Sequence, residues 1–166
     1  MKPIVQEDPT GCGIASVAAL VGRPYTVVKK AAAALGIDVS DPRLWSDTAH
    51  VRRLLAFYRR AAGEKEEPFV SWARLPARAL LAIKWHREKA GPAWHWVVFI
   101  REERGSYVLD PKRALRTNRR TDFGRMKPRW FIRPENEAES SRESTRPAVT
   151  RRGKARGARA VRLAPV

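Results

Sequence analysis

The chain contains a single cysteine, Cys12, which lies between two glycines. Residues 9–11 are Pro-Thr-Gly, which is typical of a turn and helix cap, and residues 14–21 predict a helix. Cys12 then lies at or near a helix N-terminus, where free backbone N–H groups and the helix dipole favour a thiolate. Because a thiolate attacks carbonyl carbons, the first hypothesis is a cysteine nucleophile; the alternative is a small buried hydrophobic side chain.

His95 and Asp110 lie at the two ends of the strongest predicted strand pair. Residues 94–100 are aromatic and β-branched and predict a buried strand that carries His95 at its start. Residues 102–105 predict a turn, and residues 106–109 predict the returning strand, which ends at Asp110 because the following proline cannot continue a ladder. Pairing across this turn places position 95 opposite position 110 or 111, with Cβ atoms about 4.5–5.5 Å apart if directly opposed.

These residues together could perform acyl chemistry. Asp110 could hold one imidazole nitrogen of His95, and the other nitrogen could take the proton of Cys12. The side-chain amide of Gln6 could donate to an oxyanion beside the backbone N–H of Cys12. Each residue alone has an ordinary structural explanation, but the ordered set Gln, Cys, His, Asp is far more specific. We interpret the other two histidines, His50 and His86, as solvated.

The elements that must position this set change type along the chain. Helices are predicted at residues 14–21, 27–35 and 48–62, and the third has apolar residues at i, i+3, i+4 and i+7. An apolar run at 79–85 and strands at 94–100, 106–109 and 129–132 follow. Helices first and strands afterwards predict an α+β fold, with a helical layer against a mostly antiparallel sheet.

Size and composition limit the remaining possibilities. A chain of 166 residues, 43% of them hydrophobic, is expected to form one domain with a real core. Its apolar runs are too short to span a bilayer, and we see no signal-peptide pattern. One cysteine excludes an intrachain disulfide and a four-cysteine zinc site, so we expect a reducing, cytoplasmic location, with export by a non-classical route left open.

The formal charge of +17 is unevenly spread. Residues 112–133 contain nine Lys and Arg against one acid, and residues 134–166 contain eight against four. The second segment is rich in Ser, Arg, Ala and Gly, so we predict a domain at 1–133 and a disordered tail at 134–166. Such a tail either gives weak, non-specific binding to nucleic acid or another acidic surface, or only adds solubility.

The motifs Gln6-(five residues)-Cys12-Gly13, His95-Trp96-Val97-Val98 and Val108-Leu109-Asp110-Pro111 resemble the papain-like cysteine peptidases of the bacteriocin-processing, double-glycine-leader type, in their small standalone form. The resemblance covers residues 4–133 in order and spacing. It implies that a helical half carrying Cys12 packs on a sheet half carrying His95 and Asp110, with a cleft between them. It also implies Gln6 as oxyanion donor, Cys12 as nucleophile, His95 as general base and acid, and Asp110 as the orienting carboxylate. The basic segment 112–133 and the Arg-rich tail depart from the family pattern.

Several functions remain open. The leading expectation is a peptidase that cleaves an amide bond of a peptide or protein and needs no metal or organic cofactor. Deamidation or acyl transfer to another amine uses the same first half-reaction. A basic nucleic-acid-binding module belongs to a different class, although no helix-turn-helix, zinc-finger or RNP-type signature is evident. A catalytically inactive relative that only binds peptides is the last alternative.

Overall fold

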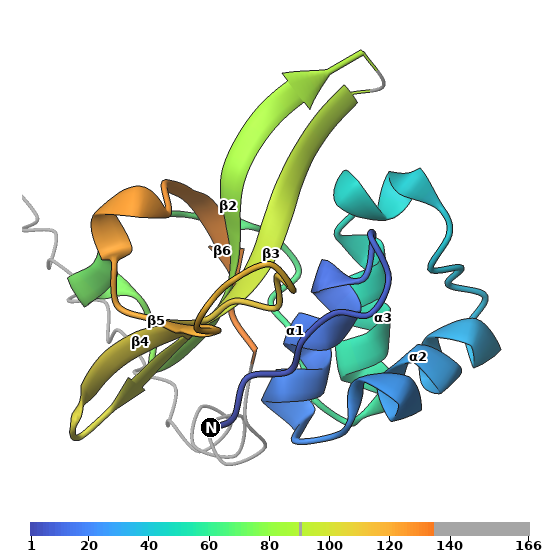
Figure 1. The fold of residues 1–166 in the computed structure, drawn as a ribbon, viewed down its shortest axis with the longest axis horizontal. Coiled ribbons are helices and arrows are strands. Elements are labelled where there is room, and N and C mark those ends of the chain that lie inside the picture. The colour runs from blue at the N-terminus through green and yellow to red at the C-terminus, as the bar shows by residue number, and fades with distance from the viewer. Residues whose placement is uncertain (90, 135–166) are drawn as a thin grey trace, which may run out of the picture.

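The computed structural model describes residues 1–89 and 91–134 of the chain. Within them, three α-helices come first and an antiparallel sheet of six strands follows (Figure 1). The predicted α+β class and the order of its elements are therefore confirmed. The predicted tail, residues 134–166, lies outside the described residues except for Pro134. None of the helices in the described part of the chain is long and apolar enough to cross a membrane.

The helices are α1 (Cys12–Val21), α2 (Tyr25–Ala34) and α3 (Ala49–Phe57), with a short 3-10 turn η1 (Pro42–Trp45) before α3. The predicted third helix is too long at its C-terminal end. It stops because Arg59 adopts a left-handed φ of 54° and the chain turns away. Helix α1 ends at Gly22, whose φ of 66° suits glycine and lets its N–H bond back to the carbonyls of Ala18 and Ala19.

The sheet has the strand order β1-β6-β2-β3-β4-β5. Its strands are β1 (Glu67–Pro68), β2 (Arg78–Glu88), β3 (Gly91–Glu102), β4 (Gly105–Leu109), β5 (Arg119–Arg120) and β6 (Pro128–Ile132). The two longest, β2 and β3, form a hairpin that extends beyond the rest of the molecule (Figure 1). The apolar run at 79–85 is thus the inner half of β2, and the predicted last strand at 129–132 is β6.

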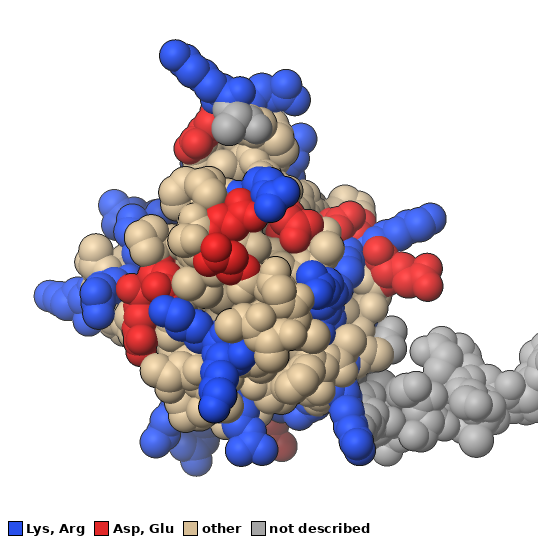
Figure 2. Space-filling model, turned by 90° about the vertical axis from the view of Figure 1, so that its right-hand side faces the viewer, with Lys and Arg blue, Asp and Glu red and all other residues tan. Residues whose placement is uncertain are grey.

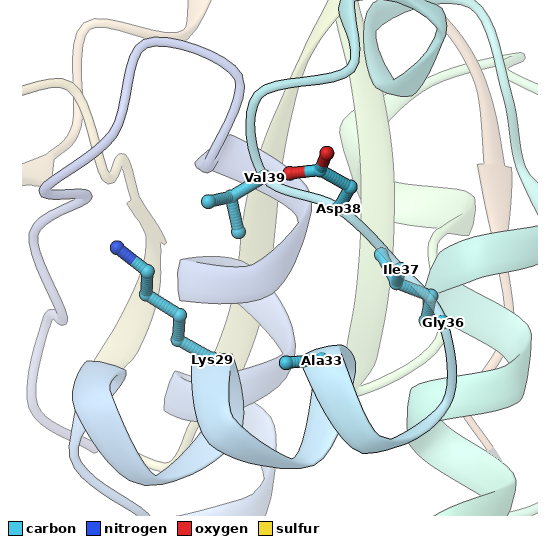
Figure 3. A pocket seen from close by; sticks show the side chains of 6 residues that line it. All are labelled: Lys29, Ala33, Gly36, Ile37, Asp38 and Val39. Atoms are coloured by element: carbon cyan, nitrogen blue, oxygen red, sulfur yellow. The ribbon is translucent and has the colours of Figure 1, made fainter.

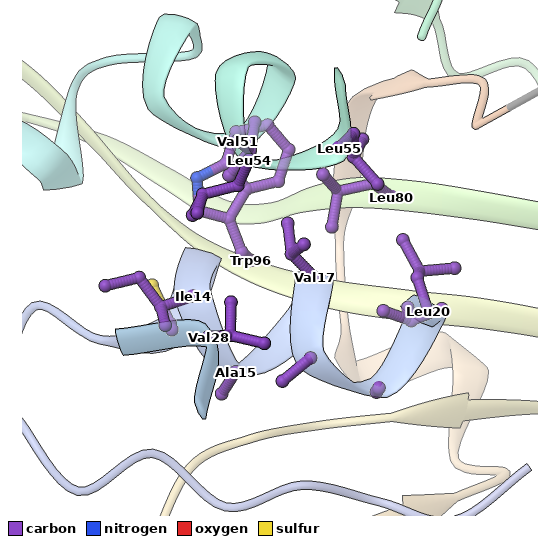
Figure 4. Close-up of a cluster of buried hydrophobic side chains, with 14 of the residues drawn as sticks. Ile14, Ala15, Val17, Leu20, Val28, Val51, Leu54, Leu55, Leu80 and Trp96 are labelled. Atoms are coloured by element: carbon purple, nitrogen blue, oxygen red, sulfur yellow. The ribbon is translucent and has the colours of Figure 1, made fainter. Parts of the chain in front are cut away.

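Two clusters of buried side chains cover the two faces of this sheet. On the helical face, Trp96 of β3 lies beside Val51 and Leu54 of α3 (Figure 4). Helix α1 is central to this cluster, because its residues from Cys12 to Leu20 are all buried. The opposite face carries Val97 and Phe99 in a second cluster, which the loops around η2 (Trp72–Arg74) and η3 (Phe123–Arg125) cover. Alternation along β3 therefore sends successive side chains into different cores.

Close packing around α1 leaves no room for a side chain at Gly13. A Cβ at this position would overlap Nε2 of His50 and lie 2.9 Å from Cγ1 of Val51 and 3.2 Å from Cδ1 of Trp96. We predict that Gly13→Ala lowers the free energy of unfolding. Overpacking a core costs about 1–3 kcal/mol, which exceeds the roughly 1 kcal/mol that alanine gains over glycine in a helix. Urea denaturation followed by circular dichroism measures the change.

Gly124→Ala is the matched control for this experiment. A Cβ at Gly124 would meet nothing within 4 Å, so the substitution should leave the unfolding free energy nearly unchanged. If Gly13→Ala were as stable as the wild type, the tight contact between α1, α3 and β3 would be refuted.

Candidate active site

Cys12 is the first residue of α1, as the sequence predicts. The preceding residue, Gly11, is the N-cap and offers no side chain to cap the helix. Among the described residues, the backbone N–H of Cys12 has no hydrogen-bond partner. Cys12 is only 2% exposed and belongs to the buried cluster on the helical face of the sheet. A free N–H next to the sulfur is the arrangement that can hold an oxyanion formed by attack of that sulfur.

His95 and Asp110 meet as predicted, but not by direct cross-strand pairing. Nε2 of His95 lies 2.7 Å from Oδ1 of Asp110. The ladder between β3 and β4 ends at the pair Val98 and Leu109, so position 95 has no partner on β4. Its registered partner is Ile83 of β2. The predicted register was wrong by one or two residues, and contact arises because Asp110 follows β4 immediately and turns its side chain towards the ring.

The carboxylate of Asp110 is 1% exposed and has a full set of donors. Besides His95, Oδ1 accepts the backbone N–H of Lys112 at 3.0 Å, and Oδ2 accepts Nη1 of Arg120 at 2.7 Å. Burial alone would raise the pKa of Asp110, but these hydrogen bonds and the nearby positive charges lower its pKa to about 2. Asp110 is therefore ionised throughout the neutral range.

The imidazole of His95 is held between this carboxylate and the thiol of Cys12. Burial lowers the pKa of the ring, but hydrogen bonds to Asp110 and Cys12 outweigh that effect and raise the pKa of His95 to about 9. Since Nε2 is bound to Asp110, Nδ1 is the nitrogen left to face the sulfur. The side chain of His95 remains 19% exposed, whereas that of Asp110 is 1% exposed, so His95 is the more accessible of these two residues.

Gln6 lies next to both halves of the site. Its backbone N–H donates to the carbonyl of Pro111 at 2.9 Å, which places it beside the segment that carries Asp110. Its side-chain Nε2 donates to the carbonyls of Asp8 and Pro9 at 2.9 and 3.0 Å, while Oε1 is buried without a partner in the described part of the chain. Both amide hydrogens therefore bind the loop before Cys12, and donation to an oxyanion requires one of these bonds to be exchanged.

The loop before Cys12 is anchored to α2 and to the chain that follows it. Asp8 accepts the hydroxyl of Tyr25 and the ammonium of Lys29. Burial raises the pKa of Asp8, but these two partners more than compensate and lower it overall. Thr10 donates to the carbonyl of Val39. A shallow groove of about 270 Å³ opens beside these anchors, with Lys29 and Ala33 of α2 on one side and Val39 on the other (Figure 3).

His50 corrects one interpretation of the sequence. It was expected to be solvated, but it is 2% exposed and packs from α3 against Gly13, next to Cys12. Burial lowers the pKa of His50, with partial compensation from Asp47, whose Oδ2 lies 3.3 Å from Nδ1. Its Nε2 is buried without a partner among the described residues. His86, by contrast, is exposed on β2 as expected and contacts Glu88.

Arg120 is the site residue that sequence reasoning missed. Its guanidinium bridges Asp110 and Asp122, with 2.7 Å contacts to both, and its side chain is 10% exposed. The hydrogen bond to Asp122 and the pairing with Asp110 raise the pKa of Arg120 still further above its usual value, despite burial. The only signal in the sequence was the density of cations between residues 112 and 133, which does not single out one arginine.

Comparisons beyond the chain add nothing to this geometry. No family model, no curated protein and no solved structure matches this chain. Within residues 1–89 and 91–134, no group of three or more His, Cys, Asp or Glu side chains is arranged to hold a metal ion. Function is therefore inferred from the interaction of Cys12 with His95 and from the hydrogen bond between His95 and Asp110.

Asp110 makes a prediction for stability. Replacing it with alanine leaves the buried guanidinium of Arg120 and the ring of His95 without their shared partner. We predict that Asp110→Ala lowers the free energy of unfolding at pH 7 by about 3–5 kcal/mol, as breaking a buried ion pair does. Because the pKa of Asp110 falls from 3.8 to about 2 on folding, its contribution is complete above pH 3.8. The difference should narrow as pH falls towards 2.

Asp122→Ala is the matched control, since it removes the other carboxylate bound to Arg120. The side chain of Asp122 is 41% exposed, so its loss should cost only about 0–1 kcal/mol. Equal costs for the two variants in urea denaturation would show that Asp110 does not have the energetic role assigned to it.

Proposed function

We propose that this protein is a cysteine peptidase of papain-like type that cleaves an amide bond in a peptide or protein substrate. The single observation that carries the proposal is the continuous contact from the thiol of Cys12 to the ring of His95 and on to the carboxylate of Asp110. A buried carboxylate that orients an imidazole, which in turn faces a thiol at a helix N-terminus, is the arrangement that activates a cysteine nucleophile.

The first half of the reaction forms an acyl-enzyme. In the reactive form His95 carries the proton and Cys12 is the thiolate, and the sulfur attacks the carbonyl carbon of the scissile amide. The resulting oxyanion accepts the free backbone N–H of Cys12, and Gln6 contributes a second donor by releasing one of its loop carbonyls. The protonated ring then gives its proton to the amide nitrogen, the C–N bond breaks, and the amine leaves while the acyl group remains on sulfur.

The second half releases the acid. His95, now neutral, takes a proton from water, and the hydroxide attacks the thioester carbon. The second tetrahedral intermediate collapses by breaking the C–S bond, which returns the thiolate and the imidazolium. Asp110 keeps its negative charge in both halves, because its role is to fix the ring and to stabilise the imidazolium.

The arrangement of the layers supports the papain-like assignment. The nucleophile comes from the buried N-terminus of α1, while the histidine and the carboxylate come from β3 and the end of β4. Figure 1 shows α1 packed beside β3, and the loop before Cys12 meets the end of β4 through the hydrogen bond between Gln6 and Pro111. Resemblance to the bacteriocin-processing peptidases agrees with this division of the site between a helical half and a sheet half.

Alkylation of the thiol tests the ion pair directly. Because Cys12 is the chain's single cysteine, iodoacetamide labels one site, and mass spectrometry gives its rate. We predict that at pH 7 the wild type reacts about 10- to 100-fold faster than His95→Ala, since the imidazolium stabilises the reactive thiolate. His86→Ala, which removes an exposed histidine outside the site, should react at the wild-type rate. Equal rates in the wild type and His95→Ala would reject the pair.

Cleavage of a mixed peptide library tests the reaction itself. We predict that the wild type shortens library peptides and that Cys12→Ser loses nearly all of this activity, because the members of such a unit act together. Activity should fall as pH rises through about 9, where His95 loses the proton that the leaving amine needs. The unfolding midpoint of Cys12→Ser serves as the control for folding.

The products of the same experiment separate peptidase from deamidase. Hydrolysis of the backbone shortens the peptide, whereas deamidation keeps its length and adds about one mass unit to a Gln or Asn. Peptides that gain this mass without shortening would overturn the peptidase assignment while keeping the nucleophile. Shortening that persists in Cys12→Ser would overturn both.

A further inference from the structure

A second concave region lies on the sheet side of the site. It holds about 580 Å³ and is bounded by the bend of β2, the loop before β5, β5 itself and the two ends of η3. Its lining residues, here called the basic pocket, are Lys84, Leu115, Arg116, Thr117, Arg119, Arg120, Thr121, Asp122 and Arg125. This volume is within the range of pockets that hold small ligands or several side chains.

The basic pocket concentrates positive charge that the protein does not neutralise. Five of its lining residues are Lys or Arg, and one, Asp122, is acidic. Asp122 pairs with Arg120 and also interacts electrostatically with Arg125, and in the described part of the chain Lys84, Arg116 and Arg125 form no ion pair. The helical side of the molecule differs, because acidic and basic side chains lie interspersed on it (Figure 2). Clustered like charges repel one another, and an anionic ligand would relieve that repulsion.

Arg120 connects this pocket to the catalytic carboxylate. Its guanidinium forms part of the wall and at the same time donates to Oδ2 of Asp110 at 2.7 Å. The other oxygen of Asp110 holds His95. The basic pocket therefore adjoins Asp110 through Arg120, although Cys12, His95 and Asp110 do not line it.

The chemistry of the lining favours carboxylates of a peptide over nucleic acid. No aromatic side chain lines the basic pocket, whereas binding of single-stranded nucleic acid depends on aromatic stacking. Arginine guanidinium groups match carboxylate oxygens in fork geometry, and the hydroxyls of Thr117 and Thr121 supply further polar contacts at the pocket wall.

We infer that the basic pocket binds acidic side chains of a polypeptide substrate and so directs a nearby amide bond to Cys12 and His95. The peptide identity of the ligand rests on the proposed peptidase function. The inference adds the substrate class: chains with Asp or Glu close to the bond that is cleaved.

Binding of a fluorescein-labelled hexaglutamate peptide, followed by fluorescence anisotropy at low salt, tests the inference. The full chain with Cys12→Ser serves as parent, so that no turnover occurs. We expect Arg116→Glu/Arg125→Glu to bind the peptide at least about tenfold more weakly than the parent, because two attractive charges become repulsive. Arg116→Gln/Arg125→Gln, which only removes the charges, should give a smaller loss in the same direction. Labelled hexaglutamine should bind none of these proteins.

Arg23→Glu/Arg74→Glu is the matched control, with the same change of charge at two exposed arginines outside the pocket. It should bind hexaglutamate within about twofold of the parent. Residues after Pro134 are the same in every protein, so their basic side chains contribute equally. An equal loss in pocket and control variants would overturn the inference, as would no loss in either pocket variant.

A labelled oligothymidylate distinguishes the competing ligand. If the pocket substitutions weakened its binding and left hexaglutamate binding unchanged, the basic pocket would be a nucleic-acid site and the inference would be wrong. These measurements do not depend on thiol chemistry. A failure of the peptidase proposal, seen in the library experiment, is therefore distinguishable from a failure of the pocket to bind acidic peptides.

Discussion

A buried, ionised carboxylate is the constraint on which this site depends. Removing such a group from water costs several kcal/mol, and only a complete set of donors offsets that cost. Asp110 obtains its donors from the ring of His95 on β3, the backbone N–H of Lys112, and Arg120 on β5. Strand β5 shares only two residue pairs with β4, so this charge also helps to hold it on the sheet. Asp110, which holds the ring of His95, thus also stabilises the attachment of β5 to the sheet.

Cys12, the proposed nucleophile, is positioned by packing rather than by charge. Helix α1 is buried on nearly all sides, so the location of Cys12 follows from how this helix fits between β3 and the other two helices. Gly13 permits the closest of these contacts, because His50 and Trp96 occupy the space that a side chain would need. A sulfur fixed by a rigid core and a ring fixed by a buried charge come together without a flexible loop between them.

Much of the site could be predicted from the sequence, because its members lie at the ends of strong local patterns. Cys12 begins an apolar helix, and His95 and Asp110 lie at the two ends of a strand pair joined by an evident turn. The contact of the last two was predicted, although the register was not, since turn signals locate a hairpin only to within a residue or two. His50 was misplaced because the arginines that follow it suggested a solvated helix. The apolar spacing of α3 in fact buries the helix face on which His50 lies.

The role of Arg120 could not be predicted, because it depends on which cation among many meets a carboxylate ten residues earlier. From the sequence, the segment 112–133 is a uniform excess of positive charge, and nucleic-acid binding is one plausible reason for it. In three dimensions the cations of this segment have different partners. Arg120 turns inward to neutralise Asp110, Arg119 stacks on the ring of Tyr107 at 3.8 Å, and Arg116 and Arg125 line an unneutralised pocket. Net charge therefore says little about the partner until the internally paired cations are subtracted.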